Sequence, residues 1–363
     1  MKKKIAIGGS GIAGLTLGSL LKSNSNFEFV IYEKEKILNL DEGYGIQLSV
    51  NSVSFLNKIG FHQLNKNEKY HPAKLDFYSS NCTKICDLDL TTFNSANDKY
   101  TTIKRSILIN FLKEKLLSNS IIFHKKINDI KQKDNKINIC FTDGSNDHVD
   151  YLVVSDGVFS HTKSVIEKNF FKADYYGAIA IRTQIESKNI SDFVGDNISL
   201  IMGSNFHLVL YPINQKKEFN LVGIIRKKIE DNVLIKTVLE NTILKENKNL
   251  TSLLKGNLTS WPIYTSNKPI KSIYKNIFYI GDAFYTFPPT MAQGASQAIE
   301  AANELFELIR DNNTDIQNEY FKKRVERTNL INKRSKFNYF GFHITNFLLK
   351  ILRNFFLKRL VKK

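Results

Sequence analysis

The chain has 363 residues, of which 42% are hydrophobic, and it carries a formal net charge of +17. This length and composition are typical of a globular protein and predict two closely packed domains, while the absence of an internal repeat excludes a solenoid. The charge is uneven, because residues 322–363 hold thirteen Lys and Arg against the single Glu326, whereas the rest of the chain is only mildly basic at +5.

The number and spacing of the cysteines bear on whether the chain forms disulfides or a metal site. Cys82, Cys86 and Cys140 show no paired spacing and have no histidine cluster nearby. We therefore predict neither a disulfide framework nor a metal site, and we expect a reducing, cytoplasmic environment. No run of about 20 apolar residues predicts a membrane-spanning helix.

Residues 3–33 predict a strand, a glycine-rich turn, a helix and a second strand. Gly9 allows the tight turn, Gly11 lets the backbone approach a pyrophosphate, and Gly14 lets helix and strand pack closely. The helix N-terminus favours phosphate, and Glu33 at the end of the second strand can accept hydrogen bonds from ribose hydroxyls. The unit predicts a site for the ADP half of NAD or FAD, with a coincidental turn as the alternative. Its predicted cofactor contacts are Gly9, Gly11, Ile12, Ala13, Gly14 and Glu33.

Three further segments carry polar residues at element ends. In residues 43–60 two glycines, Gly43 and Gly45, precede Gln47, which we expect to be exposed, and a helix follows. Arg105 comes just ahead of an amphipathic helix, where its guanidinium could pair with phosphate or be a solvated charge. The buried strand of residues 151–154 leads to Asp156-Gly157, for which an ordinary turn is the alternative.

A second glycine-rich segment lies at residues 281–296, "GDAFYTFPPTMAQGAS". It begins with Gly281-Asp282 directly after a buried strand. It ends with Gly294 and Ala295 at the start of an alanine-rich helix. An ordinary strand, turn and helix is the alternative to a binding role.

In this order, the motifs around Gly9, Gln47, Arg105, Asp156 and Asp282 resemble those of the class A FAD-dependent aromatic hydroxylases. This family includes salicylate, para-hydroxybenzoate and ubiquinone-pathway hydroxylases. The match runs across nearly the whole chain, and residues 175–185, 200–226 and 261–284 look like the salicylate-hydroxylase branch in particular.

The resemblance implies an α/β fold with a Rossmann-like FAD-binding domain built on a parallel sheet. It also implies an inserted, mostly antiparallel substrate-binding sheet and C-terminal helices. The expected division is an FAD-binding domain of residues 1–72, 100–174 and 264–320, a substrate domain of residues 73–99 and 175–263, and a basic C-terminal helical segment of residues 321–363.

In such a fold FAD lies extended, which explains why one chain needs two glycine-rich segments. The resemblance implies that Asp282 accepts hydrogen bonds from the ribityl chain. Gly294 and Ala295 open a helix whose N–H groups face the flavin pyrimidine, where reduced flavin carries negative charge. Pro289 is expected near the flavin edge at which oxygen reacts.

Substrate contacts are expected from the inserted sheet. Arg182, His207 and Tyr211 could face the pocket, and Gln47, predicted as a cofactor contact, could approach the flavin from the other side. The alternatives are a satisfied or surface His207, a Tyr211 that only packs, and an ion pair between Arg182 and Glu186.

One departure from the family concerns the residues after Asp282. The family commonly continues with Ala-Ala-His, whereas this chain has Ala283, Phe284 and Tyr285. A tyrosine in place of the histidine changes polarity and proton supply, which affects substrate identity and the coupling of oxygen use to hydroxylation.

The implied reaction is hydroxylation of a small phenolic compound by NADH or NADPH and O2 through a flavin C4a-hydroperoxide. No second GxGxxG is present, so the nicotinamide is expected to bind transiently. The alternatives are a non-hydroxylating flavoprotein oxidoreductase of the same fold and a hydroxylase of a lipophilic quinone precursor at a membrane.

Residues 337–363 alternate bulky apolar residues with Lys and Arg. On a helical wheel one broad face holds Leu348, Leu352, Phe355 and Phe356. Lys350, Arg353 and Lys358 lie mostly opposite, although Arg359 falls on the apolar side. We expect this helix to pack on the FAD-binding domain, with peripheral contact to an anionic membrane as the alternative. No aromatic–basic RNA module is present, so nucleic-acid binding is not predicted.

Overall fold

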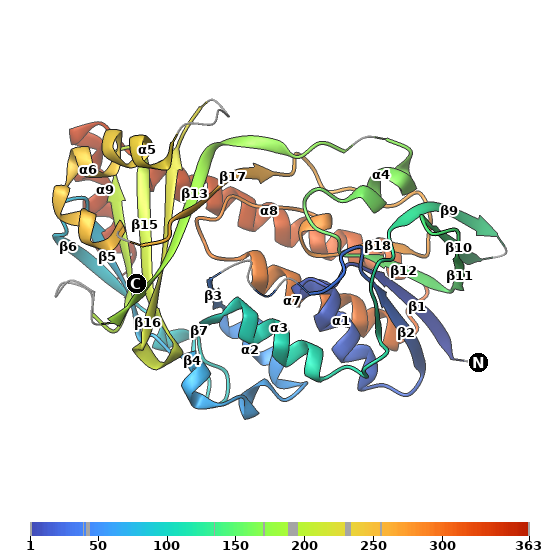
Figure 1. Ribbon diagram of the computed structural model, residues 1–363. Coiled ribbons are helices and arrows are strands. Elements are labelled where there is room, and N and C mark those ends of the chain that lie inside the picture. The colour runs from blue at the N-terminus through green and yellow to red at the C-terminus, as the bar shows by residue number, and fades with distance from the viewer. Residues whose placement is uncertain are drawn as a thin grey trace.

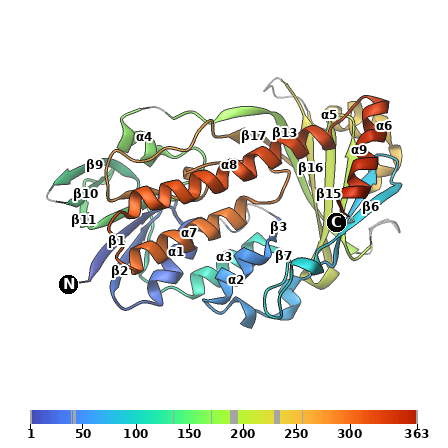
Figure 2. The same cartoon turned by 180° about the vertical axis from the view of Figure 1, so that it is seen from behind.

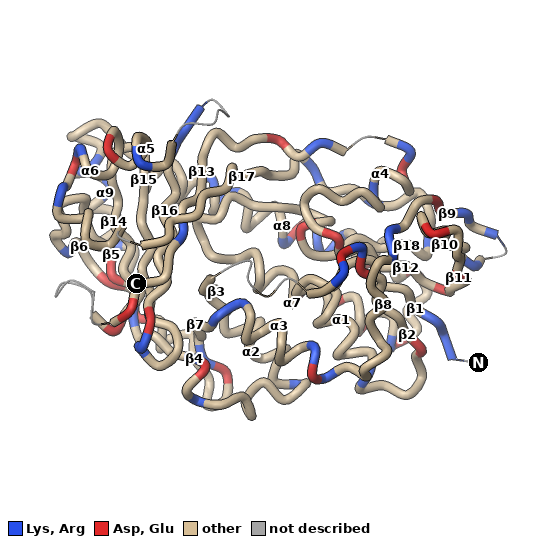
Figure 3. Tube along the Cα trace, in the orientation of Figure 1, with Lys and Arg blue, Asp and Glu red and all other residues tan. Residues whose placement is uncertain are grey.

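The computed structural model describes residues 2–38, 40, 44–133, 135–169, 171–187, 195–228, 234–254 and 256–361. Two parts lie side by side, each built on its own sheet (Figure 1). Lys and Arg are distributed over both parts and alternate with Asp and Glu along much of the chain (Figure 3).

The first part contains a five-stranded parallel sheet in the order β18-β12-β1-β2-β8. Its strands are β1 (Lys3–Gly8), β2 (Phe27–Tyr32), β8 (Ile121–Ile122), β12 (Tyr151–Val154) and β18 (Ile277–Tyr279). Because side chains alternate between the faces of a strand, Ile5 and Ile7 pack on one side of the sheet and Ala6 on the other. Both faces are therefore covered, as parallel sheets require.

Helices cover one face of this sheet and a smaller sheet covers the other. The helices are α1 (Ile12–Lys22), α3 (Arg105–Glu114) and α7 (Gly294–Arg310), whose apolar residues share a core with Ile5 and Ile7. The opposite face packs on the antiparallel strands β9 (Ile127–Lys133), β10 (Lys136–Phe141) and β11 (Asn146–Val149). The short helix α4 (His161–Glu167) follows β12, and Ser160 caps it by accepting from the Lys163 amide.

The second part is a seven-stranded sheet, antiparallel except where β14 pairs with β5. In spatial order its strands are β17 (Thr259–Thr265), β13 (Asp174–Glu186), β16 (Glu218–Arg226), β15 (Phe206–Ile213), β14 (Ile198–Gly203), β5 (Lys74–Ser79) and β6 (Lys84–Asp89). Helices α5 (Ile235–Asn241) and α6 (Ile243–Glu246) pack on one face together with Phe206, Leu208 and Leu210. His207 and Tyr211 alternate with these residues on β15 and thus belong to the opposite face.

A small antiparallel sheet joins the two parts. It consists of β3 (Gly45–Leu48), β7 (Thr101–Lys104) and β4 (Lys69–Tyr70), and helix α2 (Val50–Asn57) follows β3. The Gly45 amide donates to Oδ1 of Asn220 at 2.6 Å, and the Thr102 hydroxyl donates to the Pro212 carbonyl at 2.5 Å. The predicted fold class, a parallel sheet with an inserted and mostly antiparallel sheet, is confirmed.

Two helices end the chain. The long α8 (Ile316–Phe342) begins beside the parallel sheet and reaches the seven-stranded sheet, where α9 (Phe347–Leu360) turns back (Figure 2). The expectation that the basic helix packs on the first part is therefore wrong for α9, which lies against β6 of the seven-stranded sheet. Among the helices that the structure describes, none is long and apolar enough to cross a membrane.

Candidate functional site

The first glycine-rich loop joins β1 to α1 and leaves one side of its backbone open. Gly9 has φ +106°, and a Cβ at Gly14 would lie 2.1 Å from the Gly9 carbonyl oxygen, so the turn itself requires both glycines. A Cβ at Gly11 would meet no described atom within 4 Å. The backbone at Gly11 is thus free for the close approach of a ligand.

Glu33 is held beside this loop. Its Oε2 accepts from the amide and the hydroxyl of Ser10, at 2.9 and 2.5 Å, and its Oε1 accepts from the Glu35 amide at 3.0 Å. A carboxylate offers about four acceptor positions, so the group keeps capacity for hydroxyl donors. Its predicted role toward a ribose stays a prediction.

The second glycine-rich segment lies directly against the first. Gly281 has φ +59°, and a Cβ at this residue would lie 3.0 Å from the Cβ of Ala13. A Cβ at Gly294, the first residue of α7, would meet no described atom within 4 Å. Gly281, Asp282 and Gly294 line one cleft, and Gly281 places this cleft beside the first glycine-rich loop at Ala13, although the sequence separates the two segments by more than 250 residues.

Asp282 provides the carboxylate of this cleft. Its side chain is open to solvent, yet protein surrounds the cleft, and this partial desolvation raises the pKa of Asp282 to about 6. After Ala283, the side chains of Phe284 and Tyr285 are almost completely buried, and they line the same cleft as Asp282 and Gly294. Phe284 also packs on Tyr320 and Phe321 of α8.

The raised pKa of Asp282 implies a stability effect. Because the folded state holds this proton above the ordinary pKa of 3.8, ionisation at neutral pH destabilises the fold. Asp282→Asn is therefore expected to raise the melting temperature slightly at pH 7.5, by about 1–3 °C, and to change nothing below about pH 4. Thermal unfolding at both pH values tests this, with the exposed Glu114→Gln as the matched control. Equal effects of the two substitutions would contradict the prediction.

The Asp156-Gly157 turn borders the first loop, where a Cβ at Gly9 would lie 2.9 Å from the backbone of Asp156. Oδ2 of Asp156 accepts from the Thr162 amide at 3.1 Å, whereas its buried Oδ1 has no hydrogen-bond partner among the described residues. Gly157 has φ +86°. Arg105 is the first residue of α3, and its amide donates to the Tyr44 carbonyl at 2.8 Å. The predicted cofactor roles of Asp156, Gly157 and Arg105 stay predictions.

The structure brings two predicted substrate residues, Arg182 and Tyr211, together with the predicted cofactor contact Gln47 where β3 meets the large sheet. Oε1 of Gln47 accepts from the Tyr100 hydroxyl at 2.7 Å, so Gln47 is buried and the expectation of an exposed side chain is wrong. Tyr211 is buried beside Gly45. Burial raises the pKa of Tyr211, and the charge of Arg182 opposes that shift.

Arg182 lies in an aromatic setting. Its guanidinium lies 5.6 Å from the ring centre of Trp261, and its buried Nε has no hydrogen-bond partner within the described ranges. Sequence reasoning missed Tyr100, Asn220 and Trp261 in this cluster, although Trp261 is the only tryptophan of the chain and faces Arg182 from the neighbouring strand.

His207 is separated from these three residues. It is fully buried, its Nδ1 lies 2.8 Å from Nε2 of His343, and its ring packs on Phe342 at the end of α8. Burial lowers the pKa of His207 to about 3 and that of His343 to about 2. His207 is thus a core histidine, but its buried Nε2 has no hydrogen-bond partner among the described residues, and its substrate role stays a prediction.

This histidine pair predicts acid sensitivity. Both pKa values lie below the ordinary 6.5, so the pair stabilises the fold fully above about pH 6.5 and this stability is lost as the pH falls toward 3. The double variant His207→Leu and His343→Leu is expected to lose less stability between pH 8 and pH 5 than the unaltered chain. Melting temperatures across this range test it, with the exposed His62→Leu as control. A variant with an unchanged pH profile would contradict the prediction.

Pro289 lies exposed on the loop that precedes α7. The next residue, Thr290, donates from its hydroxyl to the Ser335 carbonyl of α8 at 2.7 Å, which ties the loop to that helix. Pro289 is thereby fixed at the rim of the site. Its predicted position near the reacting oxygen stays a prediction.

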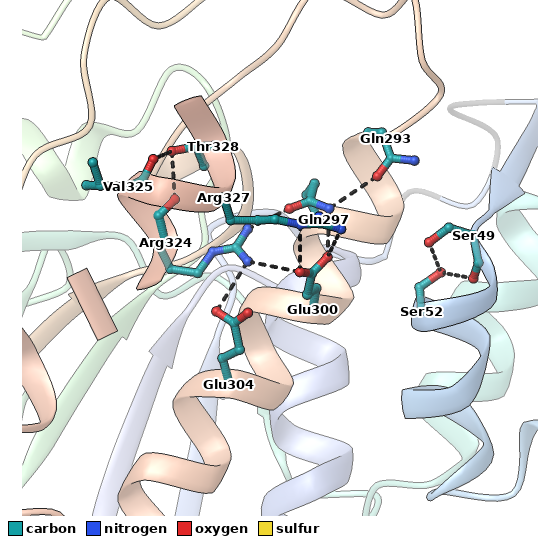
Figure 4. A network of polar contacts seen from close by, with 10 residues as sticks. All are labelled: Ser49, Ser52, Gln293, Gln297, Glu300, Glu304, Arg324, Val325, Arg327 and Thr328. Atoms are coloured by element: carbon teal, nitrogen blue, oxygen red, sulfur yellow. Dashed lines mark hydrogen bonds and ion pairs between the residues drawn. The ribbon is translucent and has the colours of Figure 1, made fainter. Parts of the chain in front are cut away.

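A polar network holds the first turns of α7 (Figure 4). Arg324 of α8 is 2% exposed, donates to Oε1 of Gln297 at 2.9 Å and pairs with Glu304 at 3.2 Å. Arg327 pairs with Glu300 at 2.9 Å. Sequence reasoning missed this network, although Gln297, Glu300 and Glu304 form a polar stripe at helical spacing within an apolar helix.

A second set of contacts holds α7 from α2. The Ser49 amide donates to the Ser296 hydroxyl at 3.0 Å, and the hydroxyls of Ser52 and Ser296 lie 3.1 Å apart. The open helix terminus at Gly294 is thus fixed from both sides. Such a rigid terminus with free N–H groups suits a ligand with partial negative charge.

Together these features fit an elongated dinucleotide. The cradle at Gly11 suits a pyrophosphate on the N-terminus of α1, and the cleft at Asp282 and Gly294 offers a carboxylate and a second helix terminus. FAD carries a pyrophosphate, ribose and ribityl hydroxyls, and a ring system that takes up negative charge, which are the groups that these residue types would bind. No cluster of His, Cys, Asp and Glu suited to a metal ion occurs among the described residues.

Comparison with known proteins gives consistent matches. A family described as "FAD binding domain" matches residues 2–324. The 3-hydroxybenzoate 6-hydroxylase 1 of Aquipseudomonas alcaligenes is 25% identical over 358 residues, covering 93% of this chain and 89% of the relative. Salicylate hydroxylase of Pseudomonas putida is 20% identical, covering 87% and 78%.

Solved structures show the same fold. Klebsiella pneumoniae HpxO, complexed with FAD and uric acid, superposes with a TM-score of 0.86 at 17% identity, covering 99% of this chain and 95% of that protein. A salicylate hydroxylase substrate complex gives a TM-score of 0.81 at 16% identity, covering 100% and 96%.

Proposed function

This chain belongs to the FAD binding domain family, and from that premise we propose that it hydroxylates a small phenolic compound with NADH or NADPH and O2. The resemblance to FAD-dependent aromatic hydroxylases inferred from the sequence is confirmed. The observation that carries the proposal is that the second glycine-rich segment lies against the first, with Gly281 beside Ala13, while the backbone at Gly11 and at Gly294 is left open.

In this proposal the residues of the two loops bind different parts of FAD. Gly11 and the N-terminus of α1 hold the pyrophosphate, and Glu33 accepts hydrogen bonds from the ribose. Asp282 accepts from the ribityl hydroxyls, while the helix terminus at Gly294 stabilises negative charge on the ring system. FAD, when bound, supplies the electron transfer and the activation of oxygen.

The overall reaction would consume one NAD(P)H, one O2 and one proton, and would release the hydroxylated ring, NAD(P)+ and water. The protein's own part is to exclude bulk water and to orient the ring. We propose that Arg182 and Tyr211 do this from the large sheet, because their side chains lie together and Arg182 keeps a buried donor without a partner in the described chain.

The substrate class follows from the same residues. A guanidinium that is stacked on Trp261 and only partly hydrogen-bonded favours an anionic group, either a carboxylate or a phenolate. The relatives named 3-hydroxybenzoate 6-hydroxylase 1 and salicylate hydroxylase carry hydroxybenzoates in their names. We therefore propose a hydroxylated aromatic acid as substrate.

The first experiment is a visible spectrum of the purified protein, followed by NADH and NADPH oxidation with phenols, hydroxybenzoates and a short-chain polyprenylphenol. The expected result is a yellow protein that adds one oxygen atom to an aromatic acid, detected by mass. A colourless protein that cannot be loaded with FAD would overturn the proposal. NAD(P)H oxidation that yields only peroxide with every compound would favour a non-hydroxylating oxidoreductase instead.

The role of Arg182 has its own test. Arg182→Gln is expected to raise KM for an aromatic acid about 10- to 100-fold, since a buried charge-assisted contact is lost. KM for a neutral phenol should change little, and steady-state kinetics with both substrates measure the difference. Equal effects on the two substrates would show that Arg182 does not bind the anionic group.

A further inference from the structure

Helix α9 is oriented with its polar side toward the protein. The residues of α9 and its C-terminal neighbour that are half-buried are Lys350, Arg353, Asn354, Leu357 and Val361. Eight apolar side chains of α9 are between 45% and 74% exposed, namely Phe347, Leu348, Leu349, Ile351, Leu352, Phe355, Phe356 and Leu360. A surface helix of a globular protein ordinarily shows the reverse arrangement.

Specific contacts hold the helix in this orientation. Nζ of Lys350 donates to the Ser204 hydroxyl at 2.9 Å, and Arg353 donates to the Gly341 carbonyl at 3.3 Å. Burial lowers the pKa of Arg353, and the charge of Glu246 opposes that shift. Leu357 and Val361 add apolar contacts to the cluster that contains Phe342. The outward apolar face is therefore a consequence of how α9 is docked.

Two neighbouring side chains of α8 extend the apolar character of this end of the molecule. Phe337 and Phe340 are 69% and 60% exposed, and α9 folds back beside the end of α8 (Figure 2). With α9 these residues define what we call the terminal apolar face. Its exposed aromatic and aliphatic side chains need a covering surface.

The charge of the neighbouring side chains indicates which kind of surface covers the terminal apolar face. Lys336, Lys358 and Arg359 are exposed, whereas Arg324 and Arg327 of the same basic segment pair with Glu304 and Glu300 of α7. A second copy of this chain would bring an equally positive segment, and the two would repel. An anionic lipid surface instead offers both an apolar boundary and negative headgroups.

We propose that α9 is an interfacial anchor that inserts its apolar face into an anionic bilayer. The helix has 14 residues and is about 21 Å long, too short to cross the hydrocarbon core but suited to lie in the plane of the interface. Lys358 and Arg359 then meet lipid phosphates, while Lys350 and Arg353 keep α9 attached to the large sheet. This inference does not depend on the proposed reaction.

The test is vesicle flotation of the full chain loaded with FAD. Vesicles of pure phosphatidylcholine are compared with vesicles containing about 30% phosphatidylglycerol, at low and high salt. Binding is expected with the anionic vesicles only and should weaken at high salt. Wild-type protein that fails to float with anionic vesicles, or that floats equally with neutral ones, would overturn the proposal.

Substitutions test whether the terminal apolar face is the part of the protein that binds the vesicles. Leu352→Gln with Phe356→Gln is expected to reduce the bound fraction at least tenfold, and Lys358→Gln with Arg359→Gln to reduce it severalfold. The matched control is Phe93→Gln with Ile273→Gln, which alters equally exposed apolar residues elsewhere. FAD content monitors folding in each protein. A dimer in lipid-free solution that the Leu352 and Phe356 variant abolishes would show that a second copy covers the face.

Discussion

Gly11→Val is expected to give a folded protein that no longer retains FAD. The backbone at Gly11 has φ −74° and ψ −176°, an extended conformation that valine adopts readily, and a Cβ would meet no described atom within 4 Å. The added side chain would instead occupy the cradle proposed for the pyrophosphate. We expect FAD affinity to fall at least 100-fold and the melting temperature of the FAD-free protein to change by less than about 2 °C.

The measurements are flavin absorbance after reconstitution and thermal unfolding without FAD. Gly195→Val is the matched control, since Gly195 is exposed and a Cβ there also meets no described atom within 4 Å. Retention of FAD by the Gly11 variant would show that the pyrophosphate lies elsewhere. Loss of fold in that variant would contradict the open space described at Gly11.

Arg324→Met is expected to destabilise the protein by about 3–5 kcal/mol. Arg324 is 2% exposed, and its removal would leave Glu304 without its cationic partner and Gln297 without its donor. A charge that stays buried without a partner is far more costly than an ion pair at the surface. Chemical denaturation measures the change in the free energy of unfolding.

Arg327→Met serves as the control for this loss. The Arg327 side chain is 32% exposed and pairs with Glu300 across the same two helices. Its removal is expected to cost only about 1 kcal/mol. Similar effects of both substitutions would contradict the assignment of Arg324 as the buried centre of the network. FAD affinity should also fall more in the Arg324 variant, because Gln297 lies in the first turn of α7.

Local requirements made the cofactor cleft largely predictable. Gly9 and Gly281 have positive φ, and a side chain at Gly14 would collide with the Gly9 carbonyl, so these positions show in the sequence as glycines. The strands around them are buried on both faces and read as continuous apolar runs. Neither feature depends on distant parts of the chain.

Long-range contacts explain what the sequence did not reveal. Gln47 appeared exposed because the residue that covers it, Tyr100, comes more than fifty residues later. His207 meets His343, and Gln297 meets Arg324, only after the long helix has packed. The helical wheel placed Lys350 and Arg353 opposite the apolar face, as in the structure, whereas Lys358, expected beside them, is exposed. Amphipathicity does not reveal which face meets the protein.

The pairing of β5 with β14 constrains the order in which the chain can fold. These strands are parallel, with Leu75 beside Ile198, and more than a hundred residues separate them. A nascent chain emerging at about 5–20 residues per second therefore carries one edge of the β5–β6 hairpin unpaired for several seconds. Because an open strand edge is a template for wrong partners, we expect yields of recombinant protein to depend on growth temperature and on chaperones that shield this hairpin until the remaining strands arrive.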